Sequence, residues 1–231
     1  MTADDADIAD SDTPADAGET DLPDDADSRH QPSSRVPGFA PGVERFGTAL
    51  LVGTLATAVL FTPLVALLPA GLLAFVLYFF RDPDRSTPDA RVVAPADGRV
   101  SVLREEEGRV RVGVFMNVTD VHVNRAPADG EVVSVTHRPG ANKPAFAKDS
   151  DRNERVDVDC GEYELSLIAG WFARRIHPYV TEGDSLRQGE RVGHIDFGSR
   201  ADVLLPADVE LDDVAVDEGE TVRAGETVLV P

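Results

Sequence analysis

Residues 193–206 read GHIDFGSRADVLLP and combine a turn of small residues with a strand-like run. The pair Gly198-Ser199 comes first, aliphatic residues dominate from Ala201 onward and Pro206 ends the run, so a strand is predicted directly after the pair. Glycine reaches backbone conformations closed to other residues, so a side chain can approach the main chain closely at Gly198. A Ser199 hydroxyl held against the Gly198 carbonyl could attack it in a self-directed acyl transfer. The alternative is a hairpin turn without chemistry.

The chain around this stretch has the pattern of a mainly β protein. From Arg91 onward it is rich in valine, and glycine or proline returns about every eight to twelve residues, which predicts a β-sandwich or barrel. Residues 94–98 (APADG) recur at 126–130, each time before a Val-rich run. Residues 180–192 recur as 216–228, and each copy places two glycine turns around one short strand. By analogy with biotinyl and lipoyl carriers, these repeated hairpins predict a barrel-sandwich-like β domain.

An apolar segment precedes the β-rich part. Residues 48–80 contain no charged side chain, and a bilayer core needs only about 20 residues of helix. Pro63 and Pro69 are expected to break the run, leaving apolar pieces at 48–62 and 70–80. The segment therefore predicts either a pair of short membrane helices or a single span with a kinked or interfacial end.

Basic side chains decide between these arrangements. Arg45 flanks one end of the apolar run, and Arg81 and Arg85 flank the other. Positive charge at both ends favours a hairpin with both ends on the cytoplasmic face. A buried helical pair in a soluble core is the remaining alternative.

The first part of the chain differs in composition from all that follows. Residues 1–42 are rich in Asp, Ala, Ser and Pro, which predicts a disordered acidic tail. The predicted organisation is therefore a tail at 1–42, a membrane-associated helical hairpin at 43–82 and a β catalytic domain at 83–231.

The charge of the chain limits its partners. There are 22 basic and 42 acidic residues, for a formal net charge of −20. Nucleic-acid binders usually show a basic footprint, so nucleic acid is excluded as a partner. Only Lys143 and Lys148 are lysines, and an acid-rich, lysine-poor composition indicates a salt-adapted, halophilic cytoplasm.

Cysteine and histidine usage predicts no metal site. The single Cys160 excludes an internal disulfide and a cysteine-based metal cluster. The five histidines show no zinc-type spacing. We interpret His137 and His177 as surface or structural residues, whereas His194 stays a candidate because it is close to Ser199 in the sequence.

Six segments, in order along the chain, carry a resemblance: residues 79–83 (FFRDP), 94–98 (APADG), 115–125 (FMNVTDVHVNR), 153–155 (NER), 168–176 (IAGWFARRI) and 197–203 (FGSRADV). Together they resemble the short archaeal and bacterial form of phosphatidylserine decarboxylase, a self-processing pyruvoyl enzyme. The segment FGSRADV places Gly198-Ser199 where that family cuts itself. The acidic tail lies outside the resemblance.

The resemblance implies a mechanism for the Gly198-Ser199 pair. The Ser199 hydroxyl would convert the Gly198 amide to an ester, elimination would break the ester, and the resulting dehydroalanine would hydrolyse to a pyruvoyl group. The products would be a β chain, 1–198, and an α chain, 199–231, which stay together. The pyruvoyl cofactor would form a Schiff base with the amine of a serine phospholipid and accept electrons as CO2 leaves. The implied product is an ethanolamine phospholipid.

The resemblance also carries roles for other residues. His122 matches a family histidine, which implies proton transfer during decarboxylation. Asp97 matches the aspartate that helps cleavage, although Asp-Gly pairs often only form turns. Longer-form enzymes carry a second histidine where this chain has Arg125, so the cleavage base stays open, and Arg125 is alternatively an oxyanion stabiliser. Arg125, Arg174 and Arg175 are the predicted substrate-binding residues, of which Arg174 and Arg175 would bind the lipid phosphate, or else face solvent.

The alternatives belong to different classes. A membrane-anchored, non-catalytic β-module that binds or scaffolds a partner would leave Gly198-Ser199 as a turn. A pyruvoyl decarboxylase of a soluble amino acid would have no use for the apolar hairpin. The favoured hypothesis is a decarboxylase of phosphatidylserine or archaetidylserine at the cell membrane, with its catalytic domain on the cytoplasmic face. The lipid chains and the oligomeric state, including a homo-oligomer, stay open.

Overall fold

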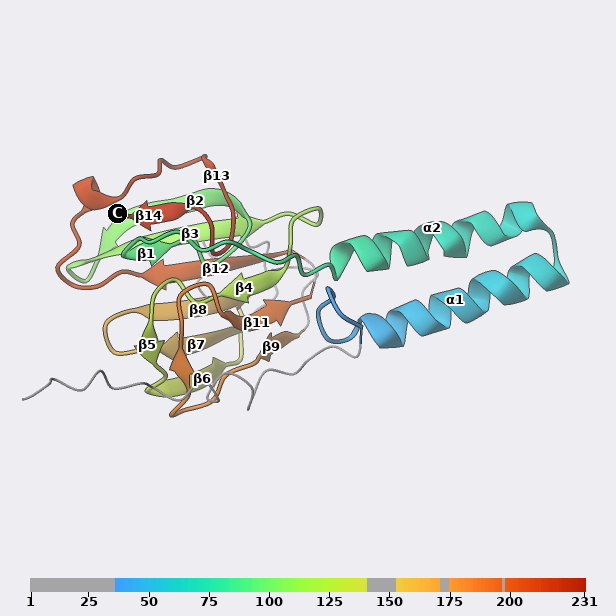
Figure 1. Cartoon of the computed structure of the whole chain (residues 1–231), viewed down its shortest axis with the longest axis horizontal. Helices are drawn as coiled ribbons and strands as arrows, with labels where there is room; N and C mark the ends of the chain where they lie inside the picture. Colours follow the sequence, from blue (N-terminus) through green and yellow to red (C-terminus); the bar gives the residue numbers. More distant parts are fainter. Residues whose placement is uncertain (1–35, 141–152, 171–174, 197) are drawn as a thin grey trace, which may run out of the picture.

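The computed structural model describes residues 36–140, 153–170, 175–196 and 198–231. It confirms a mainly β domain preceded by a helical hairpin (Figure 1). Of the predicted acidic tail, residues 1–35 lie outside the described residues. The hairpin projects from one end of the β domain, and its two helices lie side by side (Figure 1).

The hairpin consists of α1 (Val43–Leu60) and α2 (Pro63–Phe79). Gly42 caps α1 with φ +101°, a conformation that favours glycine. Thr62 caps α2 in an extended conformation, so Pro63 takes the first helical position, where its missing N–H costs nothing. The predicted break at Pro63 is therefore confirmed. The break predicted at Pro69 is wrong, because α2 continues through it and the apolar residues on both sides keep their helical conformation.

The hairpin buries few of its apolar side chains. Val59, Leu60 and Leu64 are 82%, 73% and 76% exposed. By length and composition, α1 is long and apolar enough to cross a membrane. Of its 18 residues, 6% are buried within the protein. The described β domain shows the opposite pattern, since nearly all its large apolar side chains are buried.

A seven-stranded antiparallel sheet dominates the β domain, in the order β13-β2-β3-β12-β8-β7-β6. Smaller sheets pair β1 with β14, β10 with β5, and β11 with both β4 and β9. The strands are β1 (Val92–Val93), β2 (Gly98–Glu106), β3 (Arg109–Met116), β4 (Val123–Arg125), β5 (Gly130–Glu131), β6 (Ser134–Arg138), β7 (Arg155–Asp159), β8 (Glu164–Ala169), β9 (Ile176–Pro178), β10 (Ser185–Leu186), β11 (Arg191–Ile195), β12 (Ser199–Leu204), β13 (Thr221–Val222) and β14 (Val228–Val230).

The strand predicted after Gly198 is β12, at the centre of the large sheet. It pairs with β3 on one side and β8 on the other. The later strands β13 and β14 pair with β2 and β1. Every strand after residue 198 thus pairs with a strand before it, so a cut at this point would leave two chains held by the same sheets.

The two copies of each sequence repeat occupy equivalent positions in the fold. In the longer repeat, two glycines with positive φ flank β10 and β13, as predicted: Gly183 and Gly189 in one copy, Gly219 and Gly225 in the other. The Gly189 N–H donates to the Ala126 carbonyl at 2.9 Å, and the Gly225 N–H donates to the Ala94 carbonyl at 2.8 Å. Each copy of the long repeat therefore forms a hydrogen bond to one copy of the short repeat.

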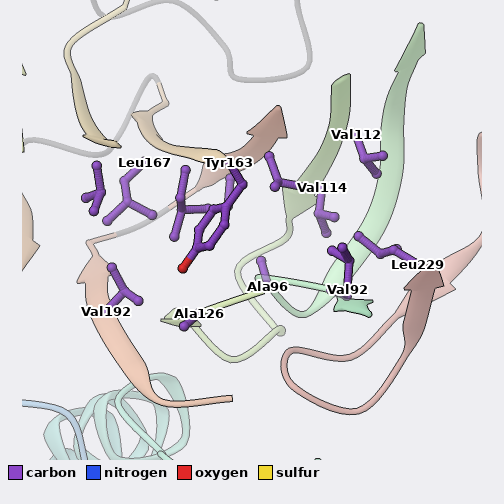
Figure 2. Packing of buried hydrophobic residues seen from close by; sticks show 14 of the residues in the cluster. Val92, Ala96, Val112, Val114, Ala126, Tyr163, Leu167, Val192 and Leu229 are labelled. Carbon is purple, nitrogen blue, oxygen red and sulfur yellow. The ribbon is translucent and has the colours of Figure 1, made fainter. Parts of the chain in front are cut away.

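Two apolar clusters stabilise the fold. The larger cluster fills the β domain, and Figure 2 shows Val92 and Leu229, from β1 and β14, packed near Val112 and Val114 of β3. The smaller one, here called the junction cluster, joins the hairpin to the β domain. Its members are Ala40, Val43, Val76, Phe79, Phe80, Val121 and Val123.

The junction cluster fixes where the hairpin leaves the β domain. Phe79 is 1% exposed, and burial of one such side chain contributes about 1.5–3 kcal/mol. The Ala40 N–H donates to the Phe80 carbonyl at 2.7 Å, and Arg81 donates to the Thr119 carbonyl at 2.8 Å. The end of α2 is thereby held against the loop that precedes β4.

Candidate active site

Ser199 is the first residue of β12 and lies fully buried in the sheet. It is paired with Met116 of β3 and Ala169 of β8. Its Oγ lies 3.8 Å from Met116 Sδ. Gly198 has φ +67°, in the left-handed region that favours glycine. The strand predicted from the sequence therefore begins at the proposed nucleophile.

His122 is the titratable side chain that contacts this turn. The Gly198 N–H donates to His122 Nε2 at 3.4 Å. On the other side of the ring, Nδ1 lies 3.0 Å from the Asp120 carbonyl oxygen. A carbonyl oxygen only accepts, so the proton belongs on Nδ1 and Nε2 presents a lone pair to the Gly198 turn.

The surroundings of His122 keep it neutral. The side chain is 2% exposed, and the Phe79 ring lies 4.3 Å away between centroids. Burial lowers the pKa of His122 from 6.5 to about 4, partly opposed by the hydrogen bond to Asp120. At neutral pH the imidazole is thus an unprotonated base beside the backbone that would be cut.

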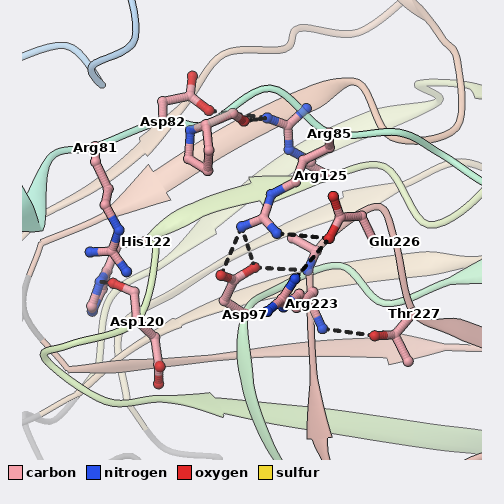
Figure 3. A network of polar contacts seen from close by, with 12 residues as sticks. Arg81, Asp82, Arg85, Asp97, Asp120, His122, Arg125, Arg223, Glu226 and Thr227 are labelled. Atoms are coloured by element: carbon pink, nitrogen blue, oxygen red, sulfur yellow. Dashed lines mark hydrogen bonds and ion pairs between the residues drawn. The ribbon is translucent and has the colours of Figure 1, made fainter.

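Asp97 has a different set of partners. Arg85 Nη2 donates to both oxygens of the Asp97 carboxylate, at 2.9 and 2.8 Å, and the Ala224 N–H donates to Oδ1 at 2.9 Å. Arg85 also pairs with Glu226 at 3.1 Å (Figure 3). Among the described residues, no hydrogen bond joins Asp97 to His122 or Ser199. These contacts favour a structural role, and the predicted part in cleavage stays a prediction.

Arg125 is held in the same way. Its guanidinium donates to Asp82 Oδ1 at 3.0 Å, to the Pro83 carbonyl at 3.0 Å and to the Gly189 carbonyl at 2.9 Å. Burial lowers its pKa, although Asp82 opposes the shift. Asp82 also pairs with Arg191. The geometry therefore favours Arg125 as a link between the end of the hairpin and the repeat turns, rather than as an oxyanion stabiliser.

A cavity of about 630 Å³ lies between the start of α1 and strands β9 and β11. Arg45 and Arg175 contribute positive charge to it, and Phe46 and Phe80 contribute apolar surface. Arg174, the other predicted phosphate ligand, lies outside the described residues. The sequence pointed to Arg45 only as a flank of the apolar run, because nothing local shows that it meets Arg175.

His194 lines the same cavity and is buried. Its Nδ1 lies 2.7 Å from the Tyr179 hydroxyl, and its ring stacks on His177 at 4.4 Å between centroids. Burial, and next the neighbouring His177, lower the pKa of His194 to about 4. Asp196 completes a group of three potential ligands with these two histidines. His177 and Asp196 were not among the predicted site residues.

The pyruvoyl group that the resemblance implies can be tested against position 199. A ketone there is uncharged and accepts hydrogen bonds without donating them. The buried position beside Met116 Sδ suits such a group, since among the described residues no hydrogen bond joins Ser199 Oγ to a charged side chain. The site therefore fits a pyruvoyl group formed from Ser199.

Comparison with known proteins places the chain in a family. The family model described as phosphatidylserine decarboxylase matches residues 72–230. A Halobacterium salinarum protein named "Putative archaetidylserine decarboxylase proenzyme" is 62% identical over 160 residues, 69% of this chain and 82% of that protein. Phosphatidylserine decarboxylase proenzymes of Streptomyces griseus and Thermobifida fusca are 50% and 48% identical, covering 71% and 84% of this chain and 77% and 88% of their own lengths. The chain belongs to the phosphatidylserine decarboxylase family.

Proposed function

We propose that this chain is a self-processing, pyruvoyl-dependent carboxy-lyase that converts a serine phospholipid to the ethanolamine phospholipid and CO2. The observation that carries the proposal is the Gly198-Ser199 pair at the start of β12, in which Ser199 is buried and the Gly198 N–H faces the lone pair of His122 Nε2. The names of the relatives, which are decarboxylase proenzymes, support both the reaction and the processing. The 62% identical relative favours archaetidylserine as the natural lipid.

Self-processing uses residues of this chain alone. His122 Nε2 takes the hydroxyl proton of Ser199, either after the Ser199 side chain changes rotamer or through one water molecule. The Ser199 Oγ then attacks the Gly198 carbonyl. The C–N bond breaks as the ester forms. Removal of the Ser199 α-proton then expels the Gly198 carboxylate. Water replaces the nitrogen of the resulting dehydroalanine, releasing ammonia and leaving a pyruvoyl group on residue 199.

In the mature enzyme the pyruvoyl group supplies an electron sink for decarboxylation. His122 then stands beside the reacting position as a proton donor or acceptor, and the surrounding strands exclude water. Arg45 and Arg175 are positioned to bind the lipid phosphate from the cavity at the base of the hairpin. The phosphate would then lie between the hairpin and the small sheet formed by β4, β11 and β9.

The hairpin suits a lipid substrate. Its exposed apolar side chains would lie in the bilayer, and Arg45 and Arg81 stand near its open end, where it meets the β domain. The β domain would then face the cytoplasmic headgroup surface, and the substrate would reach the cavity without leaving the membrane.

The first experiment is an intact-mass spectrum of the full chain, purified in high salt and detergent, beside Ser199→Ala. The expected wild-type products are 1–198 and an α chain lighter by one ammonia than a chain that begins with serine. Ser199→Ala should remain whole. The cut protein should then release CO2 from vesicles of serine phospholipid but not from free serine. An uncut wild-type chain would overturn the self-processing enzyme in favour of a binding module.

A further inference from the structure

Three potential metal ligands meet at the wall of the cavity. His177 on β9 and His194 on β11 are direct partners in the antiparallel ladder, so their side chains lie on the same face of the sheet. Their rings are stacked, within 10° of parallel and 4.4 Å apart between centroids, so the partly exposed His177 ring must turn before both nitrogens face one ion. Asp196 follows β11 directly, and one ligand atom from each of the three residues lies within 4.8 Å of the others.

The distances within this group are longer than those of typical hydrogen bonds. His177 Nε2 lies 3.5 Å from Asp196 Oδ2, and His194 Nε2 lies 3.7 Å from Asp196 Oδ1. An N–H···O hydrogen bond measures about 2.7–3.2 Å. Asp196 Oδ1 is buried and has no hydrogen-bond partner within the described part of the chain. A buried carboxylate oxygen without a partner is costly, so the group is incomplete without a further atom.

The same distances fit a bound metal ion. Zinc bonds to imidazole nitrogen and carboxylate oxygen are about 2.0–2.2 Å, which sets neighbouring ligand atoms of a tetrahedral site about 3.3–3.6 Å apart. The Tyr179 hydroxyl, 2.7 Å from His194 Nδ1, can accept the proton of that nitrogen and leave Nε2 free as a ligand. An outer hydrogen bond of this kind orients metal-binding histidines in general.

We propose that His177, His194 and Asp196 bind one divalent transition-metal ion, best matched by Zn²⁺. Two imidazoles and one carboxylate form a donor set that suits zinc and its neighbours. The fourth position opens into the cavity, where Arg45 and Arg175 would favour an anionic ligand such as hydroxide or phosphate. The proposal does not depend on the decarboxylase activity.

The test is a calorimetric titration of the chelator-stripped, full-length protein with Zn²⁺, in high salt and detergent. Wild type should bind one equivalent of Zn²⁺ tightly, and this binding should be distinct from any weak binding of Zn²⁺ by surface carboxylates. His177→Ala and Asp196→Asn should each lose more than about 100-fold in affinity, because outer-shell changes alone cost about 10–100-fold. Tyr179→Phe should lose less than either. Co²⁺ in place of Zn²⁺ should give visible ligand-field absorption in wild type that disappears in His177→Ala.

The control is His137→Ala. His137 is an exposed histidine on β6 that pairs with Glu154, away from the cavity. Its removal should leave the tight Zn²⁺ equivalent unchanged. The His177 side chain is 40% exposed, so His177→Ala should fold even if Asp196→Asn does not. Equal Zn²⁺ affinity in wild type and His177→Ala, or no tight equivalent in wild type, would overturn the proposal.

Discussion

The hairpin and the β domain differ in the exposure of their apolar side chains. In the β domain, residues such as Val93 and Val112 are 0% exposed. In the hairpin, Val59 and Leu64 are 82% and 76% exposed. Contiguous apolar surface of this kind marks a site of interaction with another apolar phase. The β domain therefore carries its own core, whereas the hairpin leaves its apolar side chains exposed, which is what the proposed membrane association requires.

The two regions meet at the residues closest to the chemistry. Phe79, the last residue of α2, packs against the ring of His122, and His122 contacts Gly198. The junction cluster thus connects the hairpin to the proposed base. The difference between the regions suggests that changes in the hairpin, the β domain and the junction should have separable effects.

The largest effect is expected at the junction. His122→Gln keeps hydrogen-bonding atoms but removes the basic nitrogen, so self-cleavage should slow by about 10²–10⁴-fold. The cleaved fraction is followed over time after cell-free synthesis. His137→Gln is the matched control and should cleave at the wild-type rate. Equal rates in both variants would show that another group is the base.

A change confined to the hairpin should affect membrane binding alone. Leu55 lies in α1 and is 60% exposed. Leu55→Arg should weaken insertion by about 2.5–3.5 kcal/mol, roughly 100-fold, because a charge is placed in the hydrocarbon. Flotation with lipid vesicles measures the bound fraction, and cleavage should persist. Val133→Arg alters a residue of the β domain that is 54% exposed and should float like wild type. Equal flotation of both variants would argue that the hairpin does not enter the bilayer.

Acid should destabilise the β domain through its buried histidines. The pKa of His122 is about 4 in the folded protein against 6.5 for an unperturbed histidine, so the unfolded chain binds the proton first as pH falls. The contribution of neutral His122 to the free energy of unfolding is therefore fully present above pH 6.5. It is lost as the pH falls to about 4, by on the order of 3 kcal/mol.

Thermal unfolding at pH 7.5 and 4.5 tests this effect. Wild type should lose more stability on acidification than His122→Gln, which lacks the group that titrates. His137→Gln should behave like wild type, since its side chain is 56% exposed. The same acid loss in His122→Gln as in wild type would contradict the assignment of His122 as a buried neutral imidazole.

The smallest effect is expected within the β domain alone. Asp97→Asn removes the charge that faces Arg85 and should cost about 2 kcal/mol of unfolding free energy. Denaturant unfolding measures the loss, and the cleaved fraction is determined in parallel. Asp208→Asn, in an exposed pair with Arg91, should cause no measurable change. If self-cleavage slowed far more than the lost free energy of unfolding explains, Asp97 would be assigned a catalytic role.

Local patterns predicted much of the fold. Val-rich alternation predicted the strands, because side-chain direction in a strand has a period of two. The glycine pairs 183/189 and 219/225 predicted the turns around β10 and β13, because positive φ is a local property. Pro69 shows the limit of such reasoning, since α2 continues through a residue that usually ends helices.

Side-chain partners could not be predicted in the same way. Asp97 meets Arg85 and Ala224, and Arg125 meets Asp82 and Gly189. Each of these contacts joins segments that are distant in sequence or separated by turns. A motif names a residue type at a position, but it does not say which other segment will face it.

The amino-acid order alone was enough for the strand that begins at Ser199 and for the apolar hairpin before the β domain, since each follows from the chemistry of adjacent residues, whereas cleavage at Gly198-Ser199 stays a prediction. Tertiary structure decided that His122 reaches Gly198, that Arg45 and Arg175 share a cavity, and that His177, His194 and Asp196 converge. The physical reason is that strand pairing and burial act between distant segments. They set distances that no local propensity contains.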